Sequence, residues 1–173
     1  MKRAIVIGAN GFLGSNLTKY LLTNGVEVCA LVQKGSCLDI SDNNLAQVEF
    51  ELSDIEGIAN FIHSTYDVLF HFAWIGVSST YKNDLSLQSQ NLKYLDEVFN
   101  LAQSIGVKRI ICPGTASEYG CSQEVITGHN TPSPSDAYSR IKLQFHEKGD
   151  HLSKEKGVDF IWTLISTAYG PDR

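Results

Sequence analysis

The stretch Ala-Ile-Val-Ile-Gly-Ala-Asn-Gly-Phe-Leu-Gly, residues 4–14, decides the fold. Its first four residues form a short apolar run rich in β-branched side chains, which predicts a strand. Gly8, Gly11 and Gly14 follow at a GxxGxxG spacing, and leucines at helical spacing continue from Leu13. This order predicts a strand, a tight turn and a helix. Such a turn can hold a pyrophosphate, because glycine lacks Cβ and a helix begins with free N–H groups, although the same glycines could serve the turn alone.

The rest of the chain repeats this alternation of strand and helix. Further strands are predicted at residues 26–32, 48–52, 68–73, 110–112 and 160–165. Helices are predicted between them, weakly at 54–62 with Asp54 as the N-cap, and strongly at 85–105 and 137–156. The alternation predicts an α/β fold with a doubly wound parallel sheet in three layers, as one domain over residues 1–173. Ligands of such sheets bind beyond the carboxyl ends of the strands, where the strand order reverses.

Composition restricts the possible partners. The net charge of −5, the pI near 5.5 and the scattered basic residues argue against a nucleic-acid partner. No segment has the length of a signal sequence or a membrane span, so we expect no membrane partner. The cysteines lack the spacing of a zinc site and indicate reduced thiols in a cytoplasmic protein; they are Cys29, Cys37, Cys112 and Cys121. No metal is expected either, because metal-ligand spacing is also absent among His63, His71, His129, His146 and His151.

A tyrosine and a lysine form the first candidate catalytic pair. Tyr138 and Lys142 are four residues apart in a predicted helix, so both side chains project from one face. A phenol titrates near pH ~10, and a neighbouring cation is needed to make it a usable base near neutrality. Spacing alone also fits a solvent-facing pair. The context is the segment Gly114–Gly120 directly after the fifth strand, which places the hydroxyl of Thr115 at the carboxyl edge of the sheet.

The end of the second strand bears on the choice of cofactor. Residues that hold an adenosine ribose are often acidic and stand at this place, but here the strand closes with Gln33 and Lys34. Lys34 could pair with a 2′-phosphate or could simply be solvated. The sequence therefore leaves NAD and NADP open, with a slight preference for NADP.

Taken together, these motifs resemble the extended short-chain dehydrogenase/reductase family, in its branch of nucleotide-sugar epimerases, 4,6-dehydratases and 4-ketoreductases. The resemblance covers essentially the whole chain and implies an NAD(P)-binding Rossmann fold. The matching segments, in order, are Gly8–Gly14, His71–Ala73, Asn91, Gly114–Gly120, Tyr138–Lys142 and Ala168–Pro171.

The resemblance implies a role for each of these segments. Tyr138 would be the catalytic acid/base, Lys142 would hold the nicotinamide ribose and lower the pKa of the tyrosine, and Thr115 would hydrogen-bond the reacting sugar oxygen, with Ser117 as a weaker substitute. Glu51 stands where the family has an aspartate that contacts adenine. With the strand-end residues included, the residues expected to bind NAD or NADP are Gly8, Gly11, Phe12, Leu13, Gly14, Gln33, Lys34, Glu51, Leu52, Phe72, Ala73, Trp74, Asn91, Tyr138 and Lys142.

Departures from the family pattern narrow the reaction. The 4,6-dehydratases carry an Asp-Glu pair directly after the catalytic threonine, where this chain has Ala116 and Ser117, and Glu118 is one place late. We therefore expect hydride transfer at C4 of a nucleotide-linked sugar, in an epimerase or a 4-ketoreductase. Two alternatives remain open, a reductase of another small ketone and a non-catalytic NAD(P)-binding regulatory protein.

In the family, the segment similar to Tyr169-Gly170-Pro171 leads into a smaller substrate-binding domain. That C-terminal domain is expected to be absent from this chain, which ends at Arg173. We then expect cofactor binding but poor turnover, because orienting the sugar supplies much of the rate. The predicted helices 85–105 and 137–156 resemble the pair that forms the family's dimer interface, so a homodimer is expected.

Overall fold

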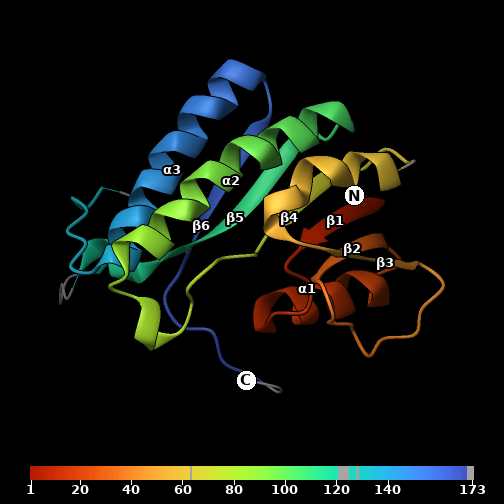
Figure 1. Ribbon diagram of the computed structural model, residues 1–173, viewed down its shortest axis with the longest axis horizontal. Coiled ribbons are helices and arrows are strands. Elements are labelled where there is room, and N and C mark those ends of the chain that lie inside the picture. Colours follow the sequence, from red (N-terminus) through yellow and green to blue (C-terminus); the bar gives the residue numbers. More distant parts are fainter. Residues whose placement is uncertain (63, 121–124, 128, 171–173) are drawn as a thin grey trace.

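A parallel sheet forms the centre of the molecule (Figure 1). The computed structural model describes residues 1–62, 64–120, 125–127 and 129–170. Within these residues six strands lie in the order β3-β2-β1-β4-β5-β6, and all pairings are parallel. The strands are β1 (Arg3–Ile7), β2 (Glu27–Gln33), β3 (Leu45–Phe50), β4 (Val68–His71), β5 (Arg109–Thr115) and β6 (Asp159–Ile165). The predicted α/β fold with a doubly wound parallel sheet is therefore confirmed.

Helices cover both faces of the sheet and give the three predicted layers. Helix α1 packs on one face, and η1, α2 and α3 pack on the other, where α2 and α3 run side by side (Figure 1). The long elements are α1 (Phe12–Thr23), the 3₁₀ helix η1 (Leu52–Phe61), α2 (Leu85–Ser104) and α3 (Ala137–Lys156). Two short 3₁₀ turns are η2 (Ser79–Tyr81) and η3 (Ala116–Tyr119).

The central strand shows why the glycine-rich stretch decides this architecture. Residues Ala4 to Ile7 of β1 are completely buried, as a strand covered by helices on both faces must be. Ile5 and Ile7 belong to the core under η1, α2 and α3, while Ala4 and Val6 belong to the core under α1. One run of apolar residues thus supplies both cores, because successive strand residues point to opposite faces.

Two predicted elements were placed wrongly. The third strand runs over 45–50 rather than 48–52, because it is an edge strand with half of its residues exposed and so lacks a continuous apolar signal. The helix expected from Asp54 is the 3₁₀ helix η1, which begins at Leu52 after the N-cap Glu51. Asp54 lies inside it with non-helical backbone angles (φ −123°, ψ 25°) and is not its N-cap.

Two strand ends also differ from the prediction. β4 stops at His71, so Phe72 and Ala73 belong to the loop beyond the sheet. β5 continues past Cys112 to Thr115, although proline usually excludes a central strand, and Pro113 pairs in register with Thr163 of β6. The longer β5 carries Thr115 to the carboxyl edge of the sheet.

No helix in the described part of the chain is long and apolar enough to cross a bilayer. In the same part, no group of three or more His, Cys, Asp or Glu side chains is arranged to hold a metal ion. Cys29 and Cys112 are buried free thiols, and Cys37 is exposed. Four residues named above lie outside the described residues, namely His63, Cys121, Pro171 and Arg173.

Candidate functional site

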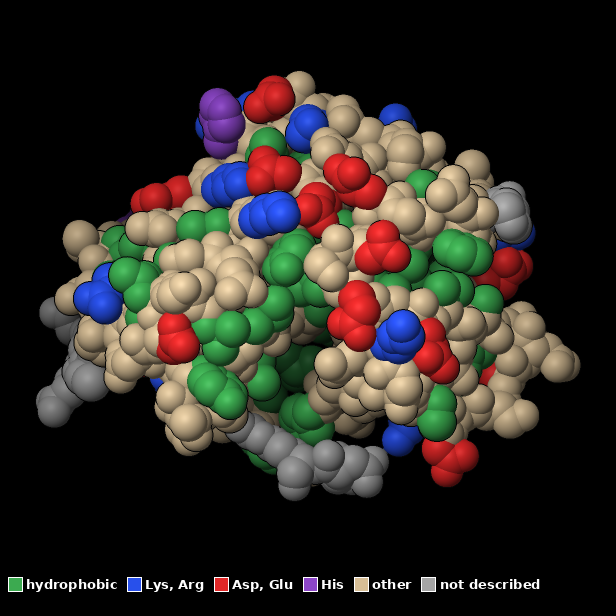
Figure 2. Space-filling model, in the orientation of Figure 1, with side chains coloured by type: hydrophobic (Ala, Val, Ile, Leu, Met, Phe, Trp, Pro, Cys, Tyr) green, Lys and Arg blue, Asp and Glu red, His purple; other side chains and the backbone are tan. Residues whose placement is uncertain are grey.

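A cleft of about 550 Å³ opens at the carboxyl ends of the strands. It lies where the strand order reverses, between β1 and β4. Figure 2 shows a hollow near the centre of this face with hydrophobic side chains in its walls. The cleft is lined by Gly8, Asn10, Gly11, Gln33, Phe50, Glu51, Leu52, Ser53, Phe72, Ala73, Trp74, Ile75, Gly76, Val77 and Tyr94. This is the place that the strand order predicts for a ligand.

The glycine turn brings backbone close together at one side of this cleft. Gly8 has φ +80°, and a Cβ there would lie 2.6 Å from the backbone nitrogen of Ala73. A Cβ at Gly14 would lie 2.2 Å from the carbonyl oxygen of Gly8. Gly11 is the N-cap of α1 and has no side chain to accept hydrogen bonds from the first turn. No N-cap side chain therefore stands over the first turn of α1, which is the place at which helices bind anionic groups.

The ends of β2 and β3 form one end of the cleft. Gln33 lines it, and its backbone N–H donates to Oδ1 of Asn10 at 3.3 Å. Glu51 and Leu52 line the same end. Lys34 is exposed and is not among the lining residues. Among the described residues, the only charged one in the lining is therefore the acidic Glu51.

The other end of the cleft is a loop held by α2. Asn91 is buried, and its side chain accepts from the N–H of Ile75 at 2.8 Å and donates to the carbonyl of the same residue at 3.1 Å. Gln88 accepts from Nε1 of Trp74 at 2.9 Å and donates to the carbonyl of Gly76 at 2.8 Å. Asn91 thus shapes the wall rather than lining the cleft. The sequence analysis did not identify the role of Gln88, although this residue lies about one turn before Asn91 on the same helix.

A cluster of three side chains lies next to this loop, namely Thr115, Tyr138 and Lys142. Tyr138 is the second residue of α3, and its phenol hydrogen-bonds the side chain of Thr115. The ammonium of Lys142 donates to the carbonyl of Pro113 at 2.9 Å and lies 5.9 Å from the centroid of the Tyr138 ring. The start of α3 is fixed by a capping box between Asp136 and Ser139. The structure therefore brings together three side chains that are up to 27 residues apart, since Thr115 and Lys142 differ by that number.

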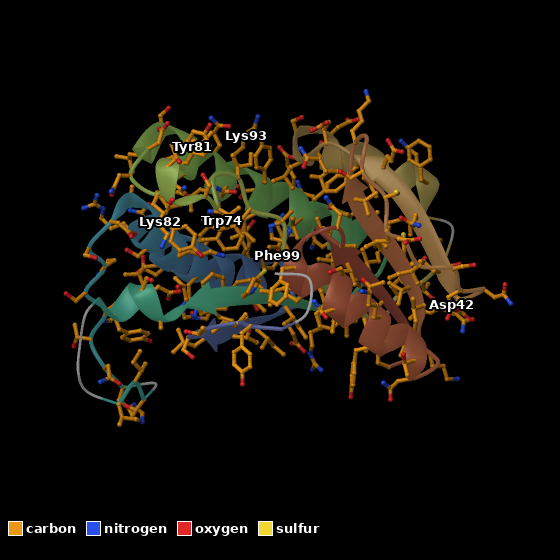
Figure 3. The ribbon with its side chains drawn as sticks, turned by 90° about the horizontal axis from the view of Figure 1, so that it is seen from below. Asp42, Trp74, Tyr81, Lys82, Lys93 and Phe99 are labelled. Carbon is orange, nitrogen blue, oxygen red and sulfur yellow. The ribbon has the colours of Figure 1, made fainter. Side chains whose placement is uncertain are left out.

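Trp74 separates this cluster from the cleft. Its ring lines the cleft, stands edge-on to Tyr138 at 5.9 Å between centroids, and lies 3.8 Å from the ammonium of Lys142. Lys82, also labelled in Figure 3, places its ammonium 5.4 Å from the centroid of the Tyr138 ring. Thr115, Tyr138 and Lys142 are not among the lining residues of the cleft. Trp74 is thus a shared wall of the cleft and the cluster, and it holds a cation–π contact with Lys142.

Burial shifts the pKa values of Lys142 and Tyr138. Desolvation lowers the pKa of Lys142 to about 8, against smaller upward effects of Cys112 and Glu118. Burial, together with the charge of Glu118, raises the pKa of Tyr138, and the hydrogen bond to Thr115 opposes this. The net effect on the pKa of Tyr138 is therefore upward in the chain by itself, and burial is its largest cause. That Lys142 lowers the pKa of the tyrosine stays a prediction.

Lys142→Met is expected to change how stability depends on pH. The pKa of Lys142 is about 8 in the folded chain and 10.5 in the unfolded chain, so the unfolded state binds more protons between these values. Below pH 8 the buried ammonium lowers the free energy of unfolding by roughly 3 kcal/mol. This destabilisation is lost as the pH rises from 8 to 10.5, so the free energy of unfolding increases over that window. The methionine variant lacks this gain. Urea unfolding of both chains at pH 7 to 10 measures it.

The matched control is Lys154→Met, which removes an exposed lysine from the last turn of the same helix. Its difference from the unchanged chain should stay constant over this pH range. A constant difference for Lys142→Met as well would contradict the buried, desolvated ammonium.

The comparisons with known proteins agree with this geometry. The family model described as "NAD dependent epimerase/dehydratase family" matches residues 4–173. A UDP-glucose 4-epimerase of Halalkalibacterium halodurans is 25% identical over 176 residues, covering 97% of this chain and 51% of the relative. A dTDP-4-dehydro-6-deoxy-D-allose reductase of Streptomyces bikiniensis is 23% identical, covering 90% of this chain and 49% of the relative. The chain spans about half the length of these curated relatives.

Solved structures show the same fold. The UDP-glucose 4-epimerase of Brucella ovis, solved in complex with NAD, superposes with a TM-score of 0.86 at 18% identity, covering 99% of this chain and 54% of that one. The UDP-glucose 4-epimerase of Thermotoga maritima, solved with UDP-glucose, superposes with a TM-score of 0.83 at 20% identity, covering 98% and 57%.

Proposed function

Since the chain belongs to the NAD-dependent epimerase/dehydratase family, we propose that it binds NAD in the cleft and supplies the acid/base group for hydride transfer at C4 of a nucleotide-linked sugar. The proposal rests on one arrangement of side chains. Thr115, Tyr138 and Lys142 form a cluster behind Trp74, which lines a cleft that begins at the glycine turn. A phenol that hydrogen-bonds a hydroxyl beside a buried ammonium can exchange a proton with a sugar hydroxyl.

The residues of the cleft fit a dinucleotide. Gly8 and Gly14 stand where any Cβ would collide with backbone, and Gly11 leaves the start of α1 without a side-chain cap. The pyrophosphate would lie at this turn, held by backbone N–H groups of Phe12 and Leu13. When bound, the nicotinamide accepts a hydride from the sugar or gives one to it. The loop 72–77 and Trp74 would form the opposite wall.

The acidic end of the cleft favours NAD over NADP. Glu51 lines this end, and Lys34 does not. A 2′-phosphate placed there would face a carboxylate and not the lysine, and like charges repel. The solved relative of Brucella ovis holds NAD, which agrees with this choice.

The side chains of the cluster have distinct tasks in the proposed reaction. Tyr138 takes the proton of the sugar hydroxyl during oxidation and returns it during reduction. Thr115 hydrogen-bonds the same oxygen and so orients it. Lys142 adds positive charge next to the phenol, which favours the phenolate as the proton moves. This division fits both an epimerase and a 4-ketoreductase.

Dehydration fits the structure less well. Both carboxylate oxygens of Glu118 accept hydrogen bonds from within the protein, from the N–H of Thr115 at 2.8 Å and from Nε1 of Trp162 at 3.2 Å. Glu118 is therefore directed into the protein and does not replace the missing acid of a 4,6-dehydratase.

The exposed faces of α2 and α3 bear on the proposed homodimer. Helices α2 and α3 pack against each other, but their exposed residues include many polar ones, such as Gln90, Lys93, Arg140, Gln144 and His151. An interface over these helices would have to be polar, and light scattering of the purified chain measures whether it forms.

The experiment that tests the proposed function combines the purified chain, NAD⁺ and UDP-glucose as probe. The proposal predicts NADH absorbance at 340 nm or UDP-galactose as product, and it predicts neither with Tyr138→Phe. Tyr20→Phe, which removes an exposed hydroxyl on α1, is the matched control and should behave like the unchanged chain. Because the chain spans about half the length of its curated relatives and poor turnover is expected of it alone, the same assay is repeated with a full-length enzyme restored by a relative's C-terminal half. Dinucleotide binding by that enzyme without any turnover of UDP-glucose or of a 4-keto nucleotide sugar would contradict the enzymatic role.

A further inference from the structure

A buried carboxylate that the proposed reaction does not use lies next to the catalytic cluster. Glu118 is only 2% exposed and belongs to η3, directly after β5. We propose that Glu118 is a positioning residue, which fixes Thr115 through its backbone and supplies the negative charge that balances Lys142 beside Tyr138. The inference rests on the proposed function only where it treats Tyr138 as the acid/base group.

The first part of the argument is a chain of hydrogen bonds from β6 to α3. Trp162 of β6 donates to one oxygen of Glu118 at 3.2 Å, and the N–H of Thr115 donates to the other at 2.8 Å. Thr115 in turn hydrogen-bonds the phenol of Tyr138. A capping box between Thr115 and Glu118 closes the turn. The position of the Thr115 hydroxyl therefore depends on a carboxylate that touches no part of the cleft.

Gly114, the residue before Thr115, lets Trp162 pack closely against β5. A Cβ at Gly114 would lie 2.3 Å from Nε1 of Trp162. Only glycine at this place lets the indole lie against β5 and reach Glu118. Both carboxylate oxygens meet N–H donors, so the site requires an acceptor on each side. A glutamine would turn one N–H₂ group toward a donor.

The second part of the argument is the charge around Tyr138 and Lys142. Tyr138 faces Lys82 from the segment before α2, Asp136 from the start of α3 and Glu118 from η3. Lys142 faces Cys112 from β5, His71 from β4 and Glu118. Within the part of the chain that the structure describes, Glu118 is the acidic side chain that acts on both groups, and its charge raises the pKa of each. Removing that charge should therefore lower both pKa values.

The test uses the full chain without cofactor or substrate, so its outcome does not depend on the proposed reaction. The titration of Lys142 is followed by NMR of labelled lysine and assigned with Lys142→Met. The titration of Tyr138 is followed by phenolate absorbance against Tyr138→Phe. In the unchanged chain we expect the midpoint of Lys142 at its lowered pKa of about 8. Glu118→Gln should move both midpoints to lower pH, and Glu118→Asp should restore them.

Trp162→Phe separates charge from structure. It removes the indole donor but keeps the carboxylate, so it should leave both midpoints close to those of the unchanged chain. The double variant Glu118→Gln with Trp162→Phe avoids the opposed donors and should show the same downward shift as Glu118→Gln. If Glu118→Gln fails to fold, the double variant and Glu118→Asp decide. Unchanged midpoints in the variants that lack the carboxylate would overturn the inference while leaving the proposed function in place.

Discussion

Tyr138→Phe is expected to lower turnover of a nucleotide sugar by about a thousandfold, the middle of the range for a positioned acid/base group. The variant keeps the ring that packs edge-on against Trp74 and under the ammonium of Lys82. It loses only the phenol oxygen and its hydrogen bond to Thr115. Because the phenol is not part of the lining of the cleft, the affinity for NADH should change less than twofold or so. Steady-state rates and an NADH titration measure the two effects separately.

Tyr20→Phe is again the control for the chemical change itself, since that tyrosine is two-thirds exposed on α1. Turnover that survives in Tyr138→Phe would remove the tyrosine from the mechanism. A parallel loss of NADH affinity would instead mean that the phenol belongs to the cofactor site.

Gly14→Ala is expected to abolish tight dinucleotide binding and to destabilise the fold. The new methyl group would lie 2.2 Å from the carbonyl oxygen of Gly8 and 2.8 Å from Cα of Ala9, so α1 must move away from β1. Overpacking of this kind costs roughly 1–3 kcal/mol of stability. Because the same displacement moves the N-terminus of α1 relative to the loop at Ala73, NADH affinity should fall by more than about tenfold, equal to 1.4 kcal/mol. Chemical unfolding and an NADH titration measure the two losses.

Gly25→Ala is the matched control. Gly25 follows α1 with φ +72°, and a Cβ there meets nothing within 4 Å. Alanine at this place imposes backbone strain of about 1 kcal/mol without touching the cleft. It should lower stability and leave NADH affinity unchanged. Equal affinity losses in both variants would show that general destabilisation, and not the glycine turn, controls binding.

The sequence predicts most of the fold because its signals are local. The run before Gly8 and the leucines after it set β1 and α1, and later apolar runs mark the buried strands β2, β4 and β5. The failures occur where the local signal is weak. β3 is an edge strand without a continuous apolar run. Pro113 usually argues against a central strand, so the predicted β5 ends at Cys112, three residues too early.

The site was predictable only in part, for the same reason. Thr115 could be placed near Tyr138 because the carboxyl ends of parallel strands meet at one edge of the sheet. The roles of Trp74 and Glu118 depend on partners far away in the sequence, such as Lys142 and Trp162, and no spacing rule links them. The raised pKa of Tyr138 was missed because it results from burial, which cannot be read from spacing.

The central claim is that the cleft between the glycine turn and Trp74 is a dinucleotide site. Titration of the purified chain with NADH and NADPH, followed by nucleotide and tryptophan fluorescence, tests it most directly, because Trp74 lines the cleft and needs no substrate to report binding. We expect saturable binding of NADH, weaker binding of NADPH, and loss of both in Gly14→Ala but not in Gly25→Ala. The absence of saturable binding by either nucleotide to the folded chain would contradict the claim.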